Sequence, residues 1–499
     1  MGSLEAFRPV ETAGGPNRLD TVPAVEEPVV RTSAGALRGR VTAHGVLFGG
    51  VPFAAPPDGE LRYRAPRPAA PWDGVRDATA VAGTMPQAVR TLPGLASGSL
   101  LGRWDGQAPE LCVNVWTPDP ATSGLPVLVW LHGGAFVAGT PALPVYDGGA
   151  WMRDGVVLVT VGYRLGVEGF VRFAGGEANV ALRDQLAALR WVQEEIANFG
   201  GDPGRVCLAG QSAGAMSLGW LLGSAQARGL FARAISMSGG LDLTLSDEQG
   251  ARVARAVAER LGVEPTAEAM RSVPVAKVIE TQAAILPGQI DLTTAEDRDP
   301  GGGLVWLMPV RDGELIADDP LAALGAAGPV GLLAGGTSEE GRLYLAGLPG
   351  FDEFSEDALA AFATMAAPDP RERLARYRRE RPTASPGDLA AQMITDVAFH
   401  EPSARLLERH AALDGGATFA YSFTWRSPAI GGRLGAAHAV DLPFVFDTLD
   451  IPGVSGADDA LLGVEGGPAE LAARMHAAWV RFTAEGTPGW SAFPHVETF

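Results

Sequence analysis

The sequence predicts an α/β fold in which a mostly parallel central sheet carries helices on both faces and a largely helical cap arises from insertions. Short, wholly apolar runs alternate with segments of helical periodicity through the middle of the chain, which is the pattern of repeated strand–helix units. Because these runs are apolar at every position, they indicate strands buried on both faces. The length of 499 residues suits one decorated α/β domain.

The elements are predicted in the following order. Residues 1–28 are expected to form a flexible extension, and residues 29–499 a single domain. Short apolar runs broken by Gly and Pro over 29–77 indicate an antiparallel, hairpin-rich entry. The stretches near 244–300 and 350–412 have helical patterns, and we expect them to form the cap over the carboxyl edge of the sheet. Buried strands are predicted over 126–131, 156–161, 206–209, 233–237, 330–334 and 419–423, and helices over 184–199 and from 213 onward.

The bulk composition excludes several classes of function. A formal net charge of −19 argues against nucleic-acid binding, which needs a basic surface, and is explained by general solubility. Lys277 is the only lysine and lies in no Walker A loop, pyridoxal-binding motif or Ser-x-x-Lys dyad. No apolar run reaches roughly 18 residues and the first thirty positions lack a signal-peptide pattern, so we expect a cytoplasmic protein that does not bind membranes.

Two cysteines are present, Cys112 and Cys207, and their spacing matches no metal site. Cys207 lies in the apolar run predicted as a strand over 206–209. We therefore expect inert buried thiols, although counting alone permits one disulfide.

The strongest chemical signal is the G-x-S-x-G motif from Gly210 to Gly214, centred on Ser212. It stands between a predicted strand and a predicted helix, which is the setting of the nucleophile elbow in α/β-hydrolases. The tight turn holds the serine in a strained backbone conformation, and side chains at the two glycine positions would clash with the neighbouring strand and helix. Ser212 is therefore predicted to be the nucleophile.

A serine nucleophile needs a base, and elimination among seven histidines leads to His438. In this fold the base follows the nucleophile and the acid in the chain, so it is expected late. His438 lies in a Gly/Ala-rich loop that enters an apolar run. The other histidines lie in a turn, in a separate motif, in helical patterns or near the C-terminus: His44, His132, His400, His410, His476 and His495.

The acid should stand between them, on a loop that follows a strand. The loop after the strand predicted over 330–334 offers Glu339 and Glu340, and the residue pattern alone does not choose between them. Asp312 and Asp318 are weaker candidates because no strong strand leads into either.

The backbone donors of an oxyanion hole are predicted in the run from His132 to Phe136, which follows a strand and is similar to the H-G-G-G loop of esterases. Glycine lets the backbone turn its N–H groups toward the substrate. The expected donors are Gly134, Ala135 and, directly after the nucleophile, Ala213.

Taken together, these motifs resemble the type-B carboxylesterase family, which includes bacterial para-nitrobenzyl esterases and the cholinesterases, and in particular actinobacterial carboxylesterases. The resemblance extends from about residue 29 to residue 490. Besides the elbow, it rests on the stretches 48–54, 71–77, 114–118, 163–166, 184–191 and 199–203.

This resemblance implies an α/β-hydrolase fold and sharpens the site. The family's acid lies in an Asp-Glu-Gly run that matches residues 339–341, so Glu340 is implied as the acid and His438 as the base. The family's serine after the next strand matches Ser238, which is expected to hold the acid in place.

The chain also departs from the family pattern. Gln211 replaces a usual glutamate in the elbow, and Ala135 and Ala439 replace common glycines. None of these changes removes a backbone donor. Glu168 stands where the family usually has an apolar residue, and the sequence offers no physical account of it.

Two further departures concern the cysteines and the C-terminus. Many secreted members of the family have a disulfide bridge whose first cysteine is replaced here by Met85, and Cys112 lies two residues beyond the position of the second cysteine. We therefore expect that this bridge is absent, which suits a reducing cytoplasm. The chain stops at Phe499, soon after Trp490, where relatives usually continue, which suggests a truncated C-terminus.

The predicted activity is hydrolysis of neutral short to medium acyl or aryl esters through a covalent acyl-enzyme, without metal or organic cofactor. The preference for neutral esters assumes that no arginine faces the path of the acyl group, although Arg311 or Arg342 could reach it from the cap. It also assumes that apolar residues such as Phe136 line the gorge, where a carboxylate would lose its water without gaining a partner. An amidase or lactonase with the same triad, or a non-catalytic binding member of the family, are the alternatives. The expected partner is a small-molecule ester, and the sequence does not separate a monomer from a dimer.

Overall fold

The structure of the protein is a computed structural model that describes residues 27–96, 101–241, 243–301, 305–367 and 369–499. The extension predicted over 1–28 lies outside the described residues except for Glu27 and Pro28. Among the described residues, no helix is both long and apolar enough to cross a membrane.

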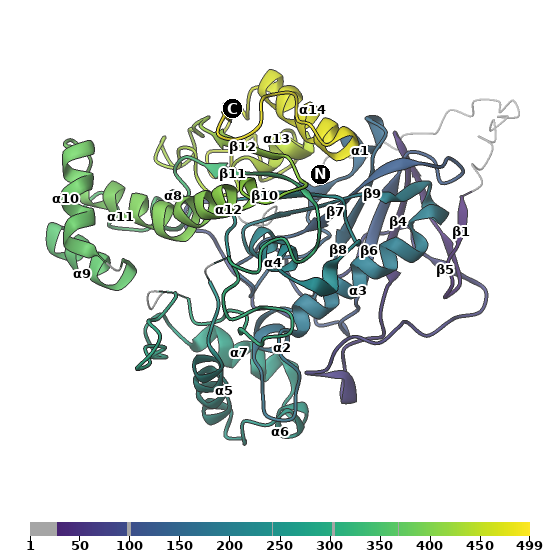
Figure 1. Cartoon of the computed structure of the whole chain (residues 1–499), viewed down its shortest axis with the longest axis horizontal. Coiled ribbons are helices and arrows are strands. Elements are labelled where there is room, and N and C mark those ends of the chain that lie inside the picture. The colour runs from purple at the N-terminus through teal and green to yellow at the C-terminus, as the bar shows by residue number, and fades with distance from the viewer. Residues whose placement is uncertain (1–26, 97–100, 242, 302–304, 368) are drawn as a thin grey trace, which may run out of the picture.

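A ten-stranded sheet in the order β13-β12-β11-β10-β9-β7-β8-β6-β4-β3 forms the centre of the molecule (Figure 1). Every neighbouring pair from β13 to β8 is parallel, and the pairs from β8 through β6 and β4 to β3 are antiparallel. The predicted α/β-hydrolase architecture with a mostly parallel sheet is confirmed. The strands are β3 (Arg40–Thr42), β4 (Gly45–Pro52), β6 (Cys112–Thr117), β7 (Leu125–Leu131), β8 (Val157–Val161), β9 (Gly201–Gln211), β10 (Arg233–Met237), β11 (Gly331–Thr337), β12 (Thr418–Phe423) and β13 (Val496–Thr498).

A small second sheet lies at the start of the described chain. It pairs β1 (Val29–Arg31) with β2 (Ala36–Arg38) in antiparallel fashion, and β2 with β5 (Val75–Asp77) in parallel. Together with the antiparallel pair of β3 and β4, it forms the hairpin-rich entry that was predicted over 29–77.

Alternation along the buried strands divides the core into two layers, because successive side chains of a strand point to opposite faces of the sheet. In β7, Val127 and Val129 belong to one layer while Leu128 and Trp130 belong to the other. Helices α3 (Val180–Glu195) and α4 (Ala213–Leu222) contribute to the first layer, and α13 (Leu442–Phe446) and α14 (Ala469–Glu485) to the second (Figure 1). Two short helices, α1 (Gly149–Arg153) and α2 (Gly166–Phe170), complete this part of the fold.

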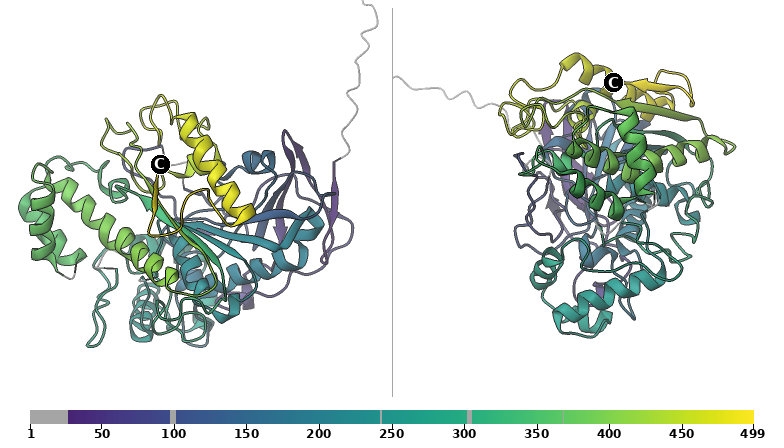
Figure 2. Two further views of the ribbon diagram at one scale, coloured as in Figure 1. Left: turned by 45° about the horizontal axis from the view of Figure 1, so that its top comes forward. Right: turned by 90° about the vertical axis from the view of Figure 1, so that its left-hand side faces the viewer.

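Two groups of helices occupy the segments predicted as cap insertions. Those of the second group extend outward from the body of the fold (Figures 1 and 2), except that its last helix, α12 (Glu401–Ala411), packs on the sheet and contributes Leu406 and Leu407 to the first core layer. The second group, after the short helix α8 (Arg342–Leu345), has a small core of its own around Leu359, Tyr377 and Leu389. Residues 285–300 were expected to be helical and are not, because Pro287, Gly288 and Pro300 interrupt any helix there. The division into one domain with two cap insertions stays a prediction. The helices are α5 (Asp247–Leu261), α6 (Ala267–Arg271), α7 (Val275–Ala284), α9 (Glu356–Ala366), α10 (Pro370–Glu380), α11 (Pro386–Ile394), a π-helix (Thr395–His400) and α12 (Glu401–Ala411).

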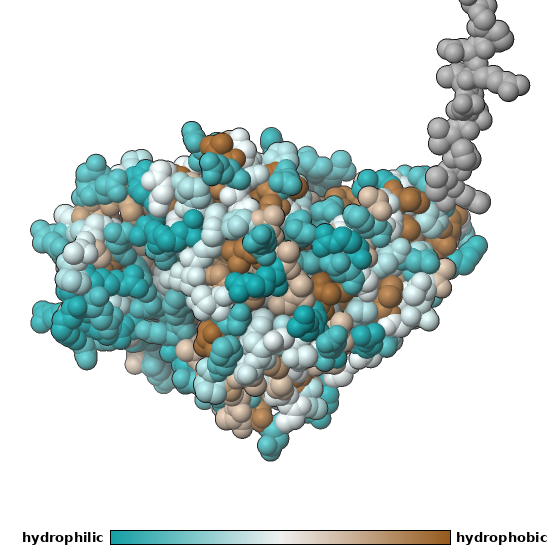
Figure 3. Space-filling model, turned by 90° about the horizontal axis from the view of Figure 1, so that it is seen from above, coloured by the Kyte–Doolittle hydropathy of each residue, from teal (hydrophilic) through white to brown (hydrophobic). Residues whose placement is uncertain are grey.

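The face of the molecule shown in Figure 3 is mostly hydrophilic, and hydrophobic side chains occur on it in small, scattered groups. This distribution agrees with the formal net charge of −19, which favours solvated side chains over a broad apolar surface.

Glu168, which the sequence left unexplained, is part of a polar cluster between α2 and the loop that follows β4. Its carboxylate accepts hydrogen bonds from Arg62 Nη2 at 2.7 Å and Nε at 3.0 Å, and from the Tyr63 hydroxyl at 2.6 Å. Arg62 also donates to the carbonyl oxygens of Arg271 and Val273, so the cluster ties the cap segment to the body of the fold. A charge in this position is therefore balanced by partners that are distant in the sequence.

Both cysteines are free, buried thiols, as predicted. Burial raises the pKa of each of them to about 12, so Cys112 and Cys207 are protonated at neutral pH and are poor nucleophiles.

Because no cross-link constrains the unfolded chain, a thiol reductant should leave the melting temperature unchanged. The measurement is a pair of thermal unfolding scans with and without reductant. A clear drop in melting temperature on reduction would mean that the two thiols are bridged.

Candidate active site

Ser212 occupies a sharp turn between the end of β9 and the start of α4. Its φ is +56°, a left-handed conformation that is strained for any residue with a side chain. The flanking glycines are required by space: a Cβ on Gly210 would lie 2.6 Å from the backbone of Gly214, and a Cβ on Gly214 would lie 2.1 Å from the carbonyl oxygen of Leu131. The turn therefore has the predicted elbow geometry, and it presents Ser212 at the carboxyl edge of the sheet.

His438 and Glu340 are brought together by loops that follow β12 and β11. His438 Nδ1 lies 2.5 Å from Glu340 Oε2, and both side chains are buried. The other carboxylate oxygen, Oε1, accepts hydrogen bonds from the Ser238 hydroxyl at 2.6 Å and from the Thr337 N–H at 2.8 Å. Ser238 thus contacts the carboxylate as the resemblance implied.

The charge on Glu340 is held by these contacts. Complete burial by itself would raise the pKa of Glu340, but the charge of His438 and the hydrogen bonds from His438 and Ser238 keep that pKa below its ordinary value. Glu339, the neighbouring candidate, instead forms ion pairs with Arg342 and Arg426. The carboxylate that reaches the histidine is therefore that of Glu340.

A second carboxyl group, that of Asp441, is buried close to the same histidine loop. Burial first, and then the charge of Glu340, raise the pKa of Asp441 to about 7. Its only side-chain partner among the described residues is the Tyr421 hydroxyl, at 3.3 Å. Below neutral pH, Glu340 is thus the one ionised carboxylate of this pair.

Gln211 contacts the histidine from the side of the nucleophile. Its Nε2 lies 3.0 Å from His438 Nε2, so its amide donates to the ring nitrogen that a base uses to accept a proton. In the described part of the chain, no hydrogen bond joins the Ser212 hydroxyl to His438. Catalytic hydrogen bonds are often loose in an unliganded site and shorten only when substrate binds.

The loop after β7 lies beside Ser212, since a Cβ on Gly133 would be 3.1 Å from the Cβ of Ser212. Gly134 has φ +124°, and a Cβ there would meet the Ala138 carbonyl oxygen at 1.9 Å. Ala135 has φ +53°. The N–H groups of Gly134 and Ala135 make no hydrogen bond with any residue that the structure describes, so they are free to bind an oxyanion.

Ala135 and Ala439, where the resemblance led us to expect glycine, both have a left-handed backbone, with φ of +53° and +68°. The geometry that favours glycine is therefore preserved although the residue has changed. Ala213, the third expected donor, is the first residue of α4, where a helix leaves its N–H groups without internal partners.

His132 is not positioned to act as the base. Its ring is buried, stacks on Tyr163 at a centroid distance of 4.4 Å, and places Nδ1 2.8 Å from the Gly133 carbonyl oxygen. Burial lowers the pKa of His132 to about 4, so it is neutral at physiological pH.

A π-helix packs against the other side of His438, and the sequence had given no sign of it. The Phe399 ring lies 4.6 Å from the imidazole between centroids, at 37°. Thr395 accepts a hydrogen bond from the N–H of Gly341, next to Glu340. Single π-helical turns are frequent at functional sites.

Ser212 and His438 line one cavity of about 130 Å³. Phe136 was expected to line the gorge, and this expectation is wrong: its ring is buried against Phe170 and Trp220, on the core side of the loop. Sequence analysis missed several lining residues, which come from irregular segments and short helices where periodicity carries no signal. They are Arg90, Thr91, Leu92, Leu101, Tyr146, Leu343, Tyr344 and Leu442.

The expectation that no arginine faces the site is also wrong, because Arg90 lines this cavity. Arg311 and Arg342, the two arginines considered from the sequence, are instead held by Asp297 at 3.0 Å and Asp388 at 2.6 Å. No cluster of three or more His, Cys, Asp or Glu suited to a metal ion occurs among the described residues.

Comparisons with known proteins identify the family of the chain. The model of the carboxylesterase family matches residues 26–497. The chain is 34% identical to the phenmedipham hydrolase of Pseudarthrobacter oxydans over 95% of this chain and 93% of that enzyme, and 34% identical to the para-nitrobenzyl esterase of Bacillus subtilis over 94% and 93%.

Among solved structures, a carboxylesterase of Geobacillus stearothermophilus superposes with a TM-score of 0.79 at 32% identity, covering 94% of this chain and 96% of that one. The similarity in sequence and in structure extends over nearly the whole chain, including the elbow that holds Ser212. The chain belongs to the carboxylesterase family and is a serine carboxylic ester hydrolase.

Proposed function

We propose that ester hydrolysis proceeds through a covalent acyl-enzyme on Ser212, with His438 as the base and Glu340 as the acid. The observation that carries this proposal is the buried 2.5 Å contact between Glu340 Oε2 and His438 Nδ1 in the loops that border the cavity of Ser212. The carboxylate fixes the proton on Nδ1, and the lone pair of Nε2 is then available to accept the serine proton.

In the first half of the reaction, His438 takes the proton of Ser212 as the serine oxygen attacks the ester carbonyl. The negative charge moves to the carbonyl oxygen, where the N–H groups of Gly134, Ala135 and Ala213 stabilise it. The carbon–oxygen bond to the alcohol then breaks, and the alcohol leaves with the proton from His438.

In the second half, His438 takes a proton from water as the water oxygen attacks the acyl carbon. The bond from that carbon to Ser212 Oγ then breaks, Oγ takes the proton back from His438, and the carboxylic acid leaves. Glu340 stays ionised throughout and stabilises the imidazolium that forms in each half. For the nucleophile to reach Nε2, the amide of Gln211 must give up its 3.0 Å hydrogen bond, and substrate binding supplies the displacement.

We further propose that esters of short to medium acyl chains and aryl esters are substrates. The cavity of about 130 Å³ is small, and Leu101, Leu343 and Leu442 line it with aliphatic surface. An apolar wall of this kind favours acyl groups of limited length.

Replacing Ser212 with Ala should lower kcat for para-nitrophenyl butyrate by at least about four orders of magnitude, because the nucleophile and base act as a unit. His438→Ala should cost about as much. The assay is paired with fluorophosphonate labelling, which should modify the wild type and leave Ser212→Ala unmodified. Labelling of the alanine variant, or near-normal turnover by His438→Ala, would contradict the proposed triad.

Glu340→Gln should reduce kcat by about a thousandfold or more, because an amide stabilises no imidazolium and permits the wrong histidine tautomer. Glu339→Gln is the matched control and should keep most activity, since Glu339 pairs with Arg342 and Arg426, and its contact with the histidine loop is to the N–H of Ala436, which an amide oxygen can still accept. Both variants are compared after thermal unfolding shows that they are folded. The opposite ranking would assign the acid to Glu339.

Gln211→Glu should move the acidic limb of the pH–rate profile upward by about one pH unit. The new carboxylate would stabilise the protonated imidazole, so the base would become available only at higher pH. Gln211→Met removes the same hydrogen bond, which favours the neutral imidazole, without adding charge, and its acidic limb should move upward by much less than that of Gln211→Glu. A profile of kcat/KM between pH 5 and 9, roughly the range in which histidine titrates, makes the comparison.

A further inference from the structure

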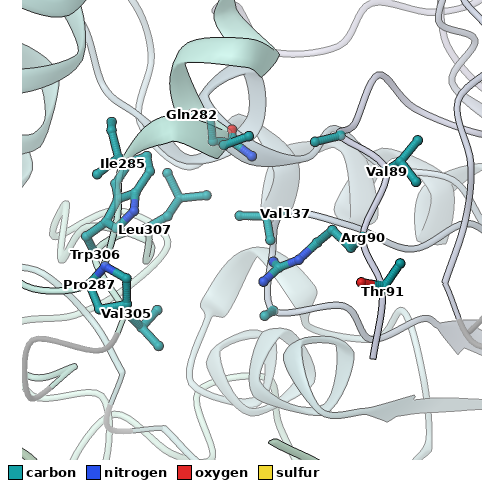
Figure 4. Close-up of a pocket in the computed structure, with 13 residues that line it drawn as sticks. Val89, Arg90, Thr91, Val137, Gln282, Ile285, Pro287, Val305, Trp306 and Leu307 are labelled. Carbon is teal, nitrogen blue, oxygen red and sulfur yellow. The ribbon is translucent and has the colours of Figure 1, made fainter. Parts of the chain in front are cut away.

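The cavity of Ser212 adjoins a second, larger cavity of about 390 Å³. Arg90, Thr91 and Ala135 line both, so the two spaces share one wall. Figure 4 shows the Arg90 side chain extending past Val137, with Trp306 and Pro287 on the facing wall. Ala135 is also an expected oxyanion donor. The guanidinium therefore lies beside the space that a substituent of the reacting ester would occupy if it extended from the smaller cavity into the larger one.

Arg90 is the only permanently charged side chain among the described residues that line either cavity. The remainder of the larger cavity is mainly apolar, with Ile285, Trp306 and Leu307 among its walls. A positive charge on an otherwise uncharged wall attracts an anion without competition from a neighbouring carboxylate.

Nothing in the described part of the protein neutralises this guanidinium. Arg90 forms no ion pair there, whereas Arg342 and Arg426 are paired with carboxylates. Arg90 is exposed, so the absence of a partner costs little in the free protein and leaves its N–H donors to water.

The nucleophile elbow adds no charge to this cavity. Gln211, which lines the same cavity as Ser212 and Arg90, has a neutral amide side chain. A glutamate would place a negative charge in the cavity and would oppose an anionic substrate. With glutamine, the fixed charge of the cavity lining is that of Arg90 alone.

We propose that Arg90 is a subsite for a carboxylate of the substrate, so that esters carrying a free carboxylate a few bonds from the scissile carbonyl are preferred over matched neutral esters. This inference rests on the proposed function of the same cavity. The planar guanidinium binds a carboxylate through two parallel N–H···O hydrogen bonds. It reverses the ranking expected from the sequence, which assumed that such a carboxylate finds no partner.

The test compares two pairs of substrates. On the acyl side, the para-nitrophenyl half-ester of adipic acid is compared with para-nitrophenyl hexanoate, which has a methyl group in place of the carboxylate. On the alcohol side, the butyrate ester of para-hydroxybenzoate is compared with that of its methyl ester. The enzymes are the wild type, Arg90→Gln, Arg90→Lys and, as a control for net charge far from the site, Arg31→Gln in strand β1.

In at least one pair, Arg90→Gln should lower kcat/KM for the carboxylate substrate by about fivefold, the upper range for an exposed ion pair, and change the neutral partner by less than about twofold. Arg90→Lys should restore part of the loss, and Arg31→Gln should match the wild type. High ionic strength should weaken the wild-type preference and leave Arg90→Gln unaffected.

Two failures are distinguishable. Equal effects of Arg90→Gln on the charged and neutral members of both pairs would overturn the subsite while leaving ester hydrolysis intact. If the wild type hydrolyses none of the four esters and takes no fluorophosphonate label, then the proposed function itself fails.

Discussion

One buried carboxylate, that of Glu340, joins the ends of three neighbouring parallel strands. Its two oxygens accept from Ser238 after β10, from Thr337 at the end of β11 and from His438 in the loop after β12. A buried charge is costly unless its oxygens are all satisfied, so only an arrangement that brings these donors together is stable. The positions of His438 and of the loop that carries it therefore follow from the requirement to solvate this one group.

Much of this arrangement could be predicted from the sequence because its signals are local. The strand over 233–237 was predicted with its observed bounds, and the elbow at Ser212 is required by the two glycines that flank it. Contacts distant in the sequence gave no such signal. Arg90 lies in an irregular segment, and the partners of Glu168 lie more than a hundred residues before it. Their positions depend on tertiary packing, which periodicity does not encode.

The electrostatics of the site follow a simple division. The ionised Glu340 lies behind the imidazole and Asp441 is kept protonated up to about pH 7, so negative charge is kept away from the cavity wall. In front of the imidazole, the neutral amide of Gln211 and the backbone N–H groups face the space where the ester reacts. The wall that meets substrate is thus rich in donors and free of carboxylates among the residues described.

The parallel order of the sheet also bears on how the active enzyme forms during folding. The oxyanion loop follows β7, the elbow follows β9, and the acid and base follow β11 and β12, so residues as far apart as Gly134 and His438 meet at one edge. Contacts of such high sequence separation form late, because the closure of long loops must precede them. A folding intermediate that lacks β12 already contains the complete elbow but has no base. Most of the helices and of the buried core can form before the final strands are added to the sheet. Regain of esterase activity during refolding is consequently a more stringent test of native structure than helix content or core burial.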